Sequence, residues 1–255
     1  MSAQPKLAWQ EVHKRFEGAP VLDGLDLSVP AGRSLVIIGG SGQGKSVTLK
    51  LALGLMQPDA GRILLDGEDI TGLPGPAKRR LSSRFGVLFQ GAALFDSLRV
   101  WENVAFRLIN ADGTPRGPAR ERAVEAMARV RLDASVADLY PGELSGGMQK
   151  RVGLARAVVA TPEILFFDEP TTGLDPITAA AINALIIEQV RRLGCTAVSI
   201  THDLASARTI GDEIVLLNAG RIVWRGGPDE LNTTDDPQVR QFVDGRAAGP
   251  LTRPG

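Results

Sequence analysis

Cysteine and histidine are scarce in this sequence of 255 residues. Cys195 is the single cysteine, so the chain cannot form an internal disulfide or a cysteine-rich metal site. His13 and His202 are the two histidines, which are too few for a histidine zinc cluster. These absences exclude stabilisation by an internal disulfide and zinc sites built from cysteine or histidine clusters.

Long apolar runs and net charge are lacking as well. No apolar run approaches the ~20 residues that a membrane-spanning helix needs, and the first residues lack the pattern of a signal peptide. Lys and Arg together number 29, as do Asp and Glu, so the formal charge is 0. This balance argues against a protein that coats nucleic acid. Because 44% of the residues are hydrophobic, we expect a globular protein. Together with the missing apolar run and the balanced charge, this predicts a cytosolic protein with no nucleic-acid partner.

The order of the predicted elements indicates an α/β core that is interrupted by helices. Short apolar runs and alternating patterns predict strands at 7–38, 62–66, 84–89, 164–167 and 195–201, and a hairpin at 214–224. Helical spacing or capping predicts helices at 46–55, 121–130, 147–159 and 176–192. Strand signals vanish between about 91 and 160. We predict an exposed loop at residues 112–118 and a polar, helical tail from Pro228 onward.

A glycine-rich loop lies between the strand predicted at 34–38 and the helix that follows it. Its residues fit the pattern G-x-x-x-x-G-K-[ST]: Gly39, Gly40, Ser41, Gly42, Gln43, Gly44, Lys45 and Ser46. Glycines let backbone N–H groups turn toward phosphate oxygens. Lys45 would reach the β- and γ-phosphates and Ser46 would bind Mg²⁺. The loop predicts a nucleotide site, which we extend to Val47.

Polar side chains follow three of the predicted strands. Asp168 and Glu169 end an apolar strand, where Asp168 could hold Mg²⁺ through water and Glu169 could act as the general base toward the attacking water. His202 and Gln90 each follow a strand. Because the carboxyl ends of parallel strands gather around a ligand, His202 could approach the γ-phosphate, and Gln90 could orient water or complete the Mg²⁺ shell. The alternative for each is an ordinary polar strand end.

A second glycine pair, Gly146 and Gly147, follows Ser145 at the start of a long predicted helix. Ser145 could cap that helix, and the glycines leave backbone N–H groups open toward an anion. Alone this signal is weak, because an N-cap followed by glycines is common.

Taken in order, these elements resemble the nucleotide-binding family of ABC transporters over about 7–227. The matching segments are Gly39–Ser46 (Walker A), Gln90 (Q-loop), Leu144–Met148 (signature), Ile164–Glu169 (Walker B), Gly173–Asp175 (D-loop) and His202 (switch histidine). Phe16 stands where the family stacks adenine. The resemblance implies a P-loop NTPase with a RecA-like parallel sheet (about 7–90 and 161–227) and an N-terminal antiparallel β layer. It also implies a helical subdomain (about 91–160) and a tail (228–255), with the whole domain at 7–245.

The same resemblance implies an ATPase that uses ATP and Mg²⁺ and works as a homodimer on the cytoplasmic face of the inner membrane. Each ATP would lie between the Walker A loop of one chain and the signature of the other, with Asp175 at the same interface. A groove after Gln90, built by 91–104, would receive a helix of a membrane permease. We expect Leu94, Phe95, Leu98 and Trp101 to expose apolar surface there. The alternative is that these side chains pack the core of the helical insertion itself.

Met148 departs from the family pattern, which has glutamine at this place in the signature. This departure, the segments 89–98 and 175–178 and the tail 236–245 are similar to the lipid-transporting, maintenance-of-lipid-asymmetry (Mla) type. That type implies phospholipid cargo and a periplasmic lipid-binding subunit. The alternative is an importer ATPase for a small polar solute. A soluble ABC protein of DNA repair or translation is disfavoured by the single cassette and single cysteine. A P-loop kinase or GTPase would leave the signature unexplained.

Overall fold

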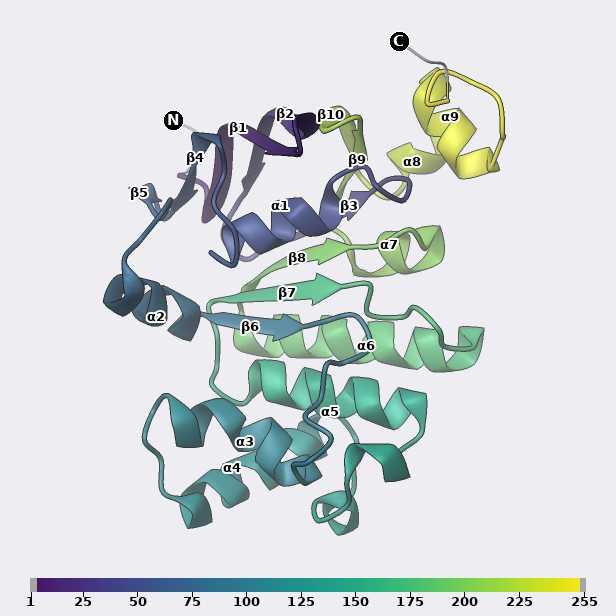
Figure 1. Ribbon diagram of the computed structural model, residues 1–255. Coiled ribbons are helices and arrows are strands. Elements are labelled where there is room, and N and C mark those ends of the chain that lie inside the picture. Colours follow the sequence, from purple (N-terminus) through teal and green to yellow (C-terminus); the bar gives the residue numbers. More distant parts are fainter. Residues whose placement is uncertain (1–3, 253–255) are drawn as a thin grey trace. The chain divides into compact units, whose positions relative to one another are not determined.

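The computed structural model describes residues 4–252 (Figure 1). The chain divides into two compact units. The first unit joins the residues up to Leu81 with those from Val198 onward, and the second is Ser82–Ala197. Across the described part of the chain, no helix has the length and the apolar character that crossing a membrane requires.

An antiparallel sheet near the N-terminus belongs to the first unit. Its strands lie in the order β2 (Ala19–Val29), β1 (Leu7–Phe16), β4 (Ala60–Leu65) and β5 (Glu68–Asp69). The register between β1 and β4 shifts between Gln10 and His13. Gly61 lies at this irregularity with φ +85°, and a Cβ there would lie 2.2 Å from the carbonyl oxygen of Glu11. Only glycine fits so close an approach. The predicted N-terminal antiparallel layer is confirmed.

A second group of strands in the first unit carries the glycine-rich loop. In it β3 (Ser34–Ile38) runs parallel to β9 (Glu213–Asn218), which forms a hairpin with β10 (Arg221–Gly226). On its other side β3 neighbours β8 (Thr196–Ile200). Just after β8 ends, the N–H of Thr201 donates to the carbonyl of Ile37 in β3. The helices of this unit are α1 (Lys45–Ala52), α2 (Gly75–Ser83, which ends past Leu81), α7 (Leu204–Ile210), α8 (Glu230–Thr233) and α9 (Pro237–Asp244). Because β3 is buried along most of its length, its packing holds the start of the loop that follows Ile38 in place.

The second unit pairs two parallel strands with helices. Leu88 of β6 (Phe85–Leu88) lies opposite Phe167 of β7 (Ile164–Asp168). The other elements are α3 (Val100–Asn110), α4 (Arg116–Arg129), two 3₁₀ turns (Ala134–Val136 and Pro141–Glu143), α5 (Gly146–Val158) and α6 (Pro176–Leu193). Between residues 91 and 160, all of which are described, every assigned element is helical.

Two glycines bring α5 close to β6. A Cβ on Gly86 of β6 would lie 2.1 Å from the carbonyl oxygen of Ala157, and a Cβ on Gly153 of α5 would lie 2.6 Å from Cδ1 of Leu88. Real Cβ atoms essentially never lie this close to another heavy atom. The helix that starts at Ser145 is therefore packed directly against the strand that ends before Gln90.

One local prediction is wrong. Residues 112–118 are not a loop throughout, because α4 begins at Arg116 and includes Gly117 and Pro118 in its first turn. Proline is tolerated there since the first N–H groups of a helix have no partner within the helix. The helix predicted to start after Asp175 is confirmed: Asp175 accepts the N–H groups of Ile177 and Thr178, and Gly194 ends the helix with φ +60°.

Candidate functional site

The phosphate loop, residues 39–46, adopts a backbone that only its glycines allow. Gly39, Gly42 and Gly44 have φ values of +154°, +78° and +99°. A Cβ on Gly39 would lie 2.4 Å from the carbonyl oxygen of Leu217, and one on Gly44 would lie 2.8 Å from that of Val21. A side chain at Gly39 or Gly44 would therefore collide with the backbone of a neighbouring strand. The loop runs directly into the N-terminus of α1, where the helix dipole favours an anion.

Lys45 places a cation inside this loop. The residue is buried, and its ammonium donates to the carbonyls of Gly39 and Gly40 at 2.8 Å each. Ser41 and Ser46 are exposed, and Val47 is partly exposed. Glycine backbone, a helix N-terminus and an ammonium group together fit a phosphate chain.

Gln43 ties the loop to a hairpin far along the chain. Its Oε1 accepts the N–H of Ala219 at 2.6 Å, in the turn between β9 and β10. Sequence reasoning placed Gln43 in the loop but gave no sign of this partner, because the contact spans 176 residues.

Phe16 and His202 lie in the same unit as the phosphate loop. Phe16 ends β1, is 43% exposed, and has the ammonium of Lys14 at 5.6 Å from its ring centroid. His202 is exposed and follows Thr201, whose N–H bonds to Ile37 two residues before the loop. The Phe16 side chain is therefore partly exposed, and His202 follows a strand end that is hydrogen-bonded to the strand leading into the loop.

The second unit holds the other strand-end residues. The register that pairs Leu88 with Phe167 leaves Gln90 and Glu169 each two residues beyond a paired residue. Gln90 is exposed, whereas Glu169 is 9% exposed. Glu169 has φ +48°, and its Oε2 accepts the hydroxyl of Thr172 at 3.0 Å. A nearly buried carboxylate at a strand end is suited to accepting a proton from water.

Lys150 is a site residue that sequence reasoning missed. It is 4% exposed on α5, and its ammonium donates to the carbonyl of Glu169 at 3.2 Å. Burial lowers the pKa of Lys150, while the charges of Asp168 and Glu169 oppose that shift. A signal was present, because Lys150 shares the buried face of α5 with Leu154 and Ala157.

Arg156, also on α5, holds the segment that follows Gln90. Its guanidinium donates to the carbonyls of Ala92 and Ala93. Gly91, Ala92 and Ala93 have φ values of +69°, +62° and +46°, so three successive residues are left-handed. Burial lowers the pKa of Arg156. Two alanines in this conformation are unfavourable, and the bonds from Arg156 offset that cost.

The signature segment caps α5. Ser145 Oγ accepts the N–H of Met148 at 3.3 Å, so the cap does not use the Met148 side chain. A Cβ on Gly147 would lie 2.8 Å from Cγ2 of Thr178 on α6. Hydrogen bonds from Thr178 lower the pKa of Asp175 below its usual range. Gly146 and Gly147 thus lie beside the start of α6, which Asp175 caps.

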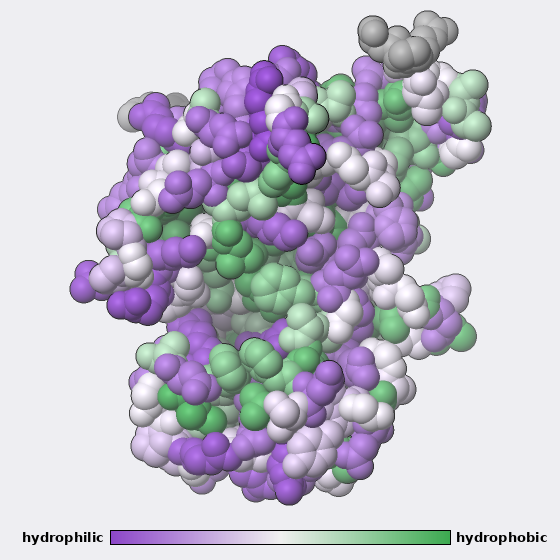
Figure 2. Space-filling view, viewed as in Figure 1, coloured by the Kyte–Doolittle hydropathy of each residue, from purple (hydrophilic) through white to green (hydrophobic). Residues whose placement is uncertain are grey.

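The segment 94–101 exposes less apolar surface than expected. Phe95 is 44% exposed and stacks on Phe106, with ring centroids 4.5 Å apart, but Trp101 is 7% exposed. The prediction that Trp101 is surface is wrong, because the helix α3 turns it inward, beneath the guanidinium of Arg116. Figure 2 shows hydrophobic patches among hydrophilic residues over α3 and α4.

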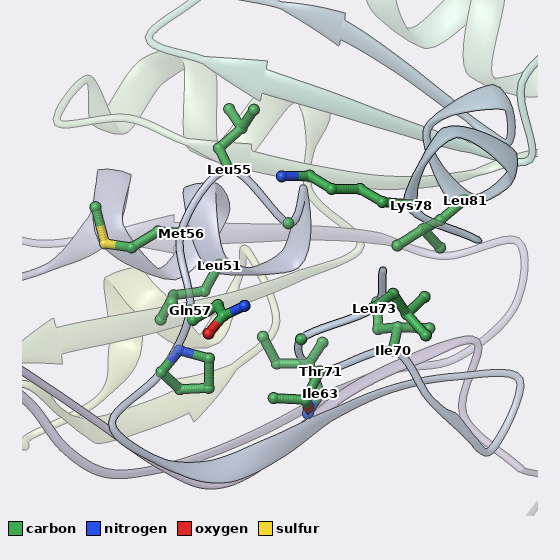
Figure 3. A pocket seen from close by; sticks show the side chains of 13 residues that line it. Leu51, Leu55, Met56, Gln57, Ile63, Ile70, Thr71, Leu73, Lys78 and Leu81 are labelled. Carbon is green, nitrogen blue, oxygen red and sulfur yellow. The ribbon is translucent and has the colours of Figure 1, made fainter. Parts of the chain in front are cut away.

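A pocket of about 170 Å³ lies elsewhere in the first unit. Figure 3 shows its wall, where Leu51, Leu55, Ile63 and Leu73 lie with Gln57 and Lys78. None of the predicted site residues lines it. Among residues 4–252, no group of three or more His, Cys, Asp and Glu side chains is placed to hold a metal ion.

Comparisons with known proteins agree with this geometry. The family model described as ABC transporter matches residues 22–172. The probable ribonucleotide transport ATP-binding protein mkl of Mycobacterium tuberculosis is 39% identical over 93% of this chain, which spans 66% of that relative. The methionine import ATP-binding protein MetN of Caulobacter vibrioides is 41% identical, over 93% of this chain and 72% of MetN. The intermembrane phospholipid transport system ATP-binding protein MlaF of Escherichia coli K12 is 38% identical, over 91% of this chain and 86% of MlaF.

A solved structure gives the same result for the fold. The dimeric post-hydrolysis state of the ATP-binding cassette MJ0796 bound to ADP and Pi matches with a TM-score of 0.79 and 30% identity. The match covers 87% of this chain and 98% of that one. The α/β fold with its parallel and antiparallel strands is that of an ABC cassette. The chain therefore belongs to the ABC transporter family.

Proposed function

We propose that this chain is the ATP-hydrolysing subunit of a transporter that moves phospholipid between the inner and outer membranes of a double-membraned bacterium. It would bind peripherally to the cytoplasmic face of the inner membrane. The observation that carries the ATPase part is the phosphate loop, in which glycine backbone encloses the ammonium of Lys45.

In this proposal the first unit binds the nucleotide. Phe16 stacks on the adenine with its exposed ring. Residues 39–47 hold the phosphates, and Lys45 exchanges its two carbonyl partners for oxygens of the β- and γ-phosphates. His202 bonds to the γ-phosphate.

The remaining steps use carboxylates and amides of the second unit. Glu169 accepts a proton from the attacking water, and Gln90 orients that water. Ser46 and Gln90 would hold Mg²⁺ directly and Asp168 would hold it through water, and the bound ion would supply positive charge near the phosphates. All three are oxygen donors, which this ion prefers, and a single carboxylate suffices because phosphates and water complete its shell.

We further propose a homodimer in which each ATP lies between two chains. Ser145, Gly146 and Gly147 would bind the γ-phosphate on the partner's phosphate loop, and Asp175 would lie at the same interface. The support is that α5 offers a second helix N-terminus with two glycines. The cassette MJ0796 is dimeric in its structure with ADP and Pi.

The cargo rests on short segments of this chain. The relatives carry three different cargoes in their names, namely ribonucleotide, methionine and phospholipid. The segments 89–98, 175–178 and 236–245 and the signature methionine Met148 favour the phospholipid type. Permease subunits would contact the surface after Gln90, where Phe95 is exposed, and a periplasmic lipid-binding subunit would complete the complex. An importer of a small polar solute is the second candidate, favoured by the identity to MetN.

The test is deletion of the gene in its host. Deletion should raise outer-leaflet phospholipid and sensitivity to detergent with EDTA, and the wild-type gene should restore both. A gene encoding Glu169→Gln should not restore them, which ties the phenotype to hydrolysis. Unchanged lipid asymmetry together with lost uptake of a small polar solute would reject the lipid cargo and leave the ATPase.

A further inference from the structure

Glu169 has a backbone conformation that its sequence disfavours. Its φ of +48° is left-handed, a conformation that is unfavourable for a residue with a Cβ. Pro170 follows it, and the residue before a proline prefers an extended backbone. Strained backbone of this kind persists only where neighbouring groups hold it in place.

Two hydrogen bonds help to hold Glu169 in this conformation. At its side chain, the hydroxyl of Thr172 donates to Oε2 at 3.0 Å. At its main chain, the ammonium of Lys150 donates to the carbonyl oxygen at 3.2 Å. That carbonyl belongs to the peptide that joins Glu169 to Pro170, so the hydrogen bond from Lys150 restrains the rotation of this peptide beside the Glu169 Cα.

The position of Lys150 is costly for the fold. A lysine that is 4% exposed loses hydration, and lysine is almost never fully buried unless it is paired. The buried face of α5 otherwise consists of apolar or small residues such as Val152, Gly153 and Leu154. An apolar residue at position 150 would pack on that face without the cost of desolvation. The charge of Lys150 therefore indicates a role other than packing.

We propose that Lys150 is a positioning residue for hydrolysis, which holds the peptide after Glu169 so that the carboxylate points at the attacking water. The proposal rests on the role of Glu169 as general base. Lys150 contacts the carbonyl of Glu169 and is assigned no contact with ATP. Its loss should therefore lower kcat and leave KM for ATP unchanged.

The experiment compares Lys150→Met with wild type in the purified full chain, with Mg²⁺ and ATP. Methionine keeps the length of the side chain and loses the ammonium. We expect kcat to fall by about tenfold to a hundredfold, the range found for groups that orient metal ligands from the outer shell, with KM for ATP within about twofold. Lys150→Arg keeps a cationic donor and should restore most of kcat.

Two controls separate positioning from general stability. Lys6→Met removes another lysine, which pairs with Asp66 at 3.0 Å and lies outside the site, and it should leave kcat unchanged. In a Glu169→Gln background the base is already lost, so Lys150→Met should change the single-turnover rate by less than about twofold. Equal loss in both backgrounds, wild-type kcat in Lys150→Met, or a fall in folded protein that accounts for the lost rate would overturn the proposal.

The same variants distinguish the two levels of the argument. If Glu169→Gln alone hydrolyses ATP at the wild-type rate, the assigned base is wrong and the inference about Lys150 fails with it. If Glu169→Gln is slow while Lys150→Met is fast, the base stands and only Lys150 loses its role.

Discussion

Lys45 is a buried cation whose ammonium contacts the backbone of its own loop, at Gly39 and Gly40. We predict that Lys45→Ala lowers the ATPase rate about 100- to 1,000-fold, because the charge that faces the γ-phosphate in the transition state is lost. Lys50→Ala, which removes an exposed lysine from the same helix, should leave the rate unchanged. The measurement is phosphate release from the purified chain. Wild-type turnover in Lys45→Ala would refute the nucleotide site.

Cys195 is buried, and burial raises its pKa to about 11. A raised pKa means that the folded chain keeps the thiol protonated where the unfolded chain ionises it. The free energy of unfolding should therefore fall as pH rises from about 9 to about 11, by about 1.4 kcal/mol per unit of pKa difference.

Urea unfolding at pH 8 and pH 10.5 measures this loss for wild type and for Cys195→Ala. The wild type should lose more stability than the variant between the two pH values. An identical loss in both proteins would show that the thiol does not titrate differently in the folded and unfolded chains.

At the scale of elements, β6 and α5 meet through Gly86 and Gly153, with no space for a side chain at either position. We predict that Gly86→Ala destabilises the chain by about 1–3 kcal/mol, since a Cβ would lie 2.1 Å from the carbonyl oxygen of Ala157. The matched control is Gly117→Ala in α4, where nothing lies within 4 Å and alanine favours helix. Thermal unfolding should show a loss in the first variant and none in the second.

The sequence predicted elements best where a local signal was strong. The strand at 164–167 and the helix from Pro176 have an apolar run and a cap, and both are present in the structure. The helix α2 (Gly75–Ser83) was not predicted, because its face is mostly polar and only Leu81 is buried. The loop predicted at 112–118 failed since glycine and proline mark a turn in sequence, yet both are tolerated in a first helical turn.

The candidate site shows the same division. Residues 39–46 could be found because one continuous segment encodes the phosphate loop. The bonds from Lys150 to Glu169 and from Arg156 to Ala92 join residues 19 and 64 positions apart. No pattern within one segment reports such contacts, since they arise only when helices and strands pack.

At the scale of the whole molecule, a composite site can be tested by mixing two inactive chains. Lys45→Ala removes the phosphate loop's charge, and Ser145→Arg blocks the start of α5, where Oγ now accepts the N–H of Met148. If each ATP lies between two chains, a mixed dimer contains one intact site. We predict that ATPase activity returns on mixing to a measurable fraction of the wild-type rate. Two results together would count against composite sites. They are a wild-type ATPase activity that rises linearly with chain concentration, and the absence of a dimer on size exclusion in the presence of ATP.

The close contact of β6 with α5 also restricts how this molecule can diverge over generations. A larger residue at Gly86 or Gly153 would need a compensating substitution on the opposing element. A single substitution at either position should therefore be eliminated by selection. A Cβ at Gly117 or Gly142 would have no atom within 4 Å, and neither glycine has a left-handed backbone. Single substitutions should therefore be tolerated at these two positions. In a saturation library selected for function, diversity should collapse at 86 and 153 and persist at 117 and 142.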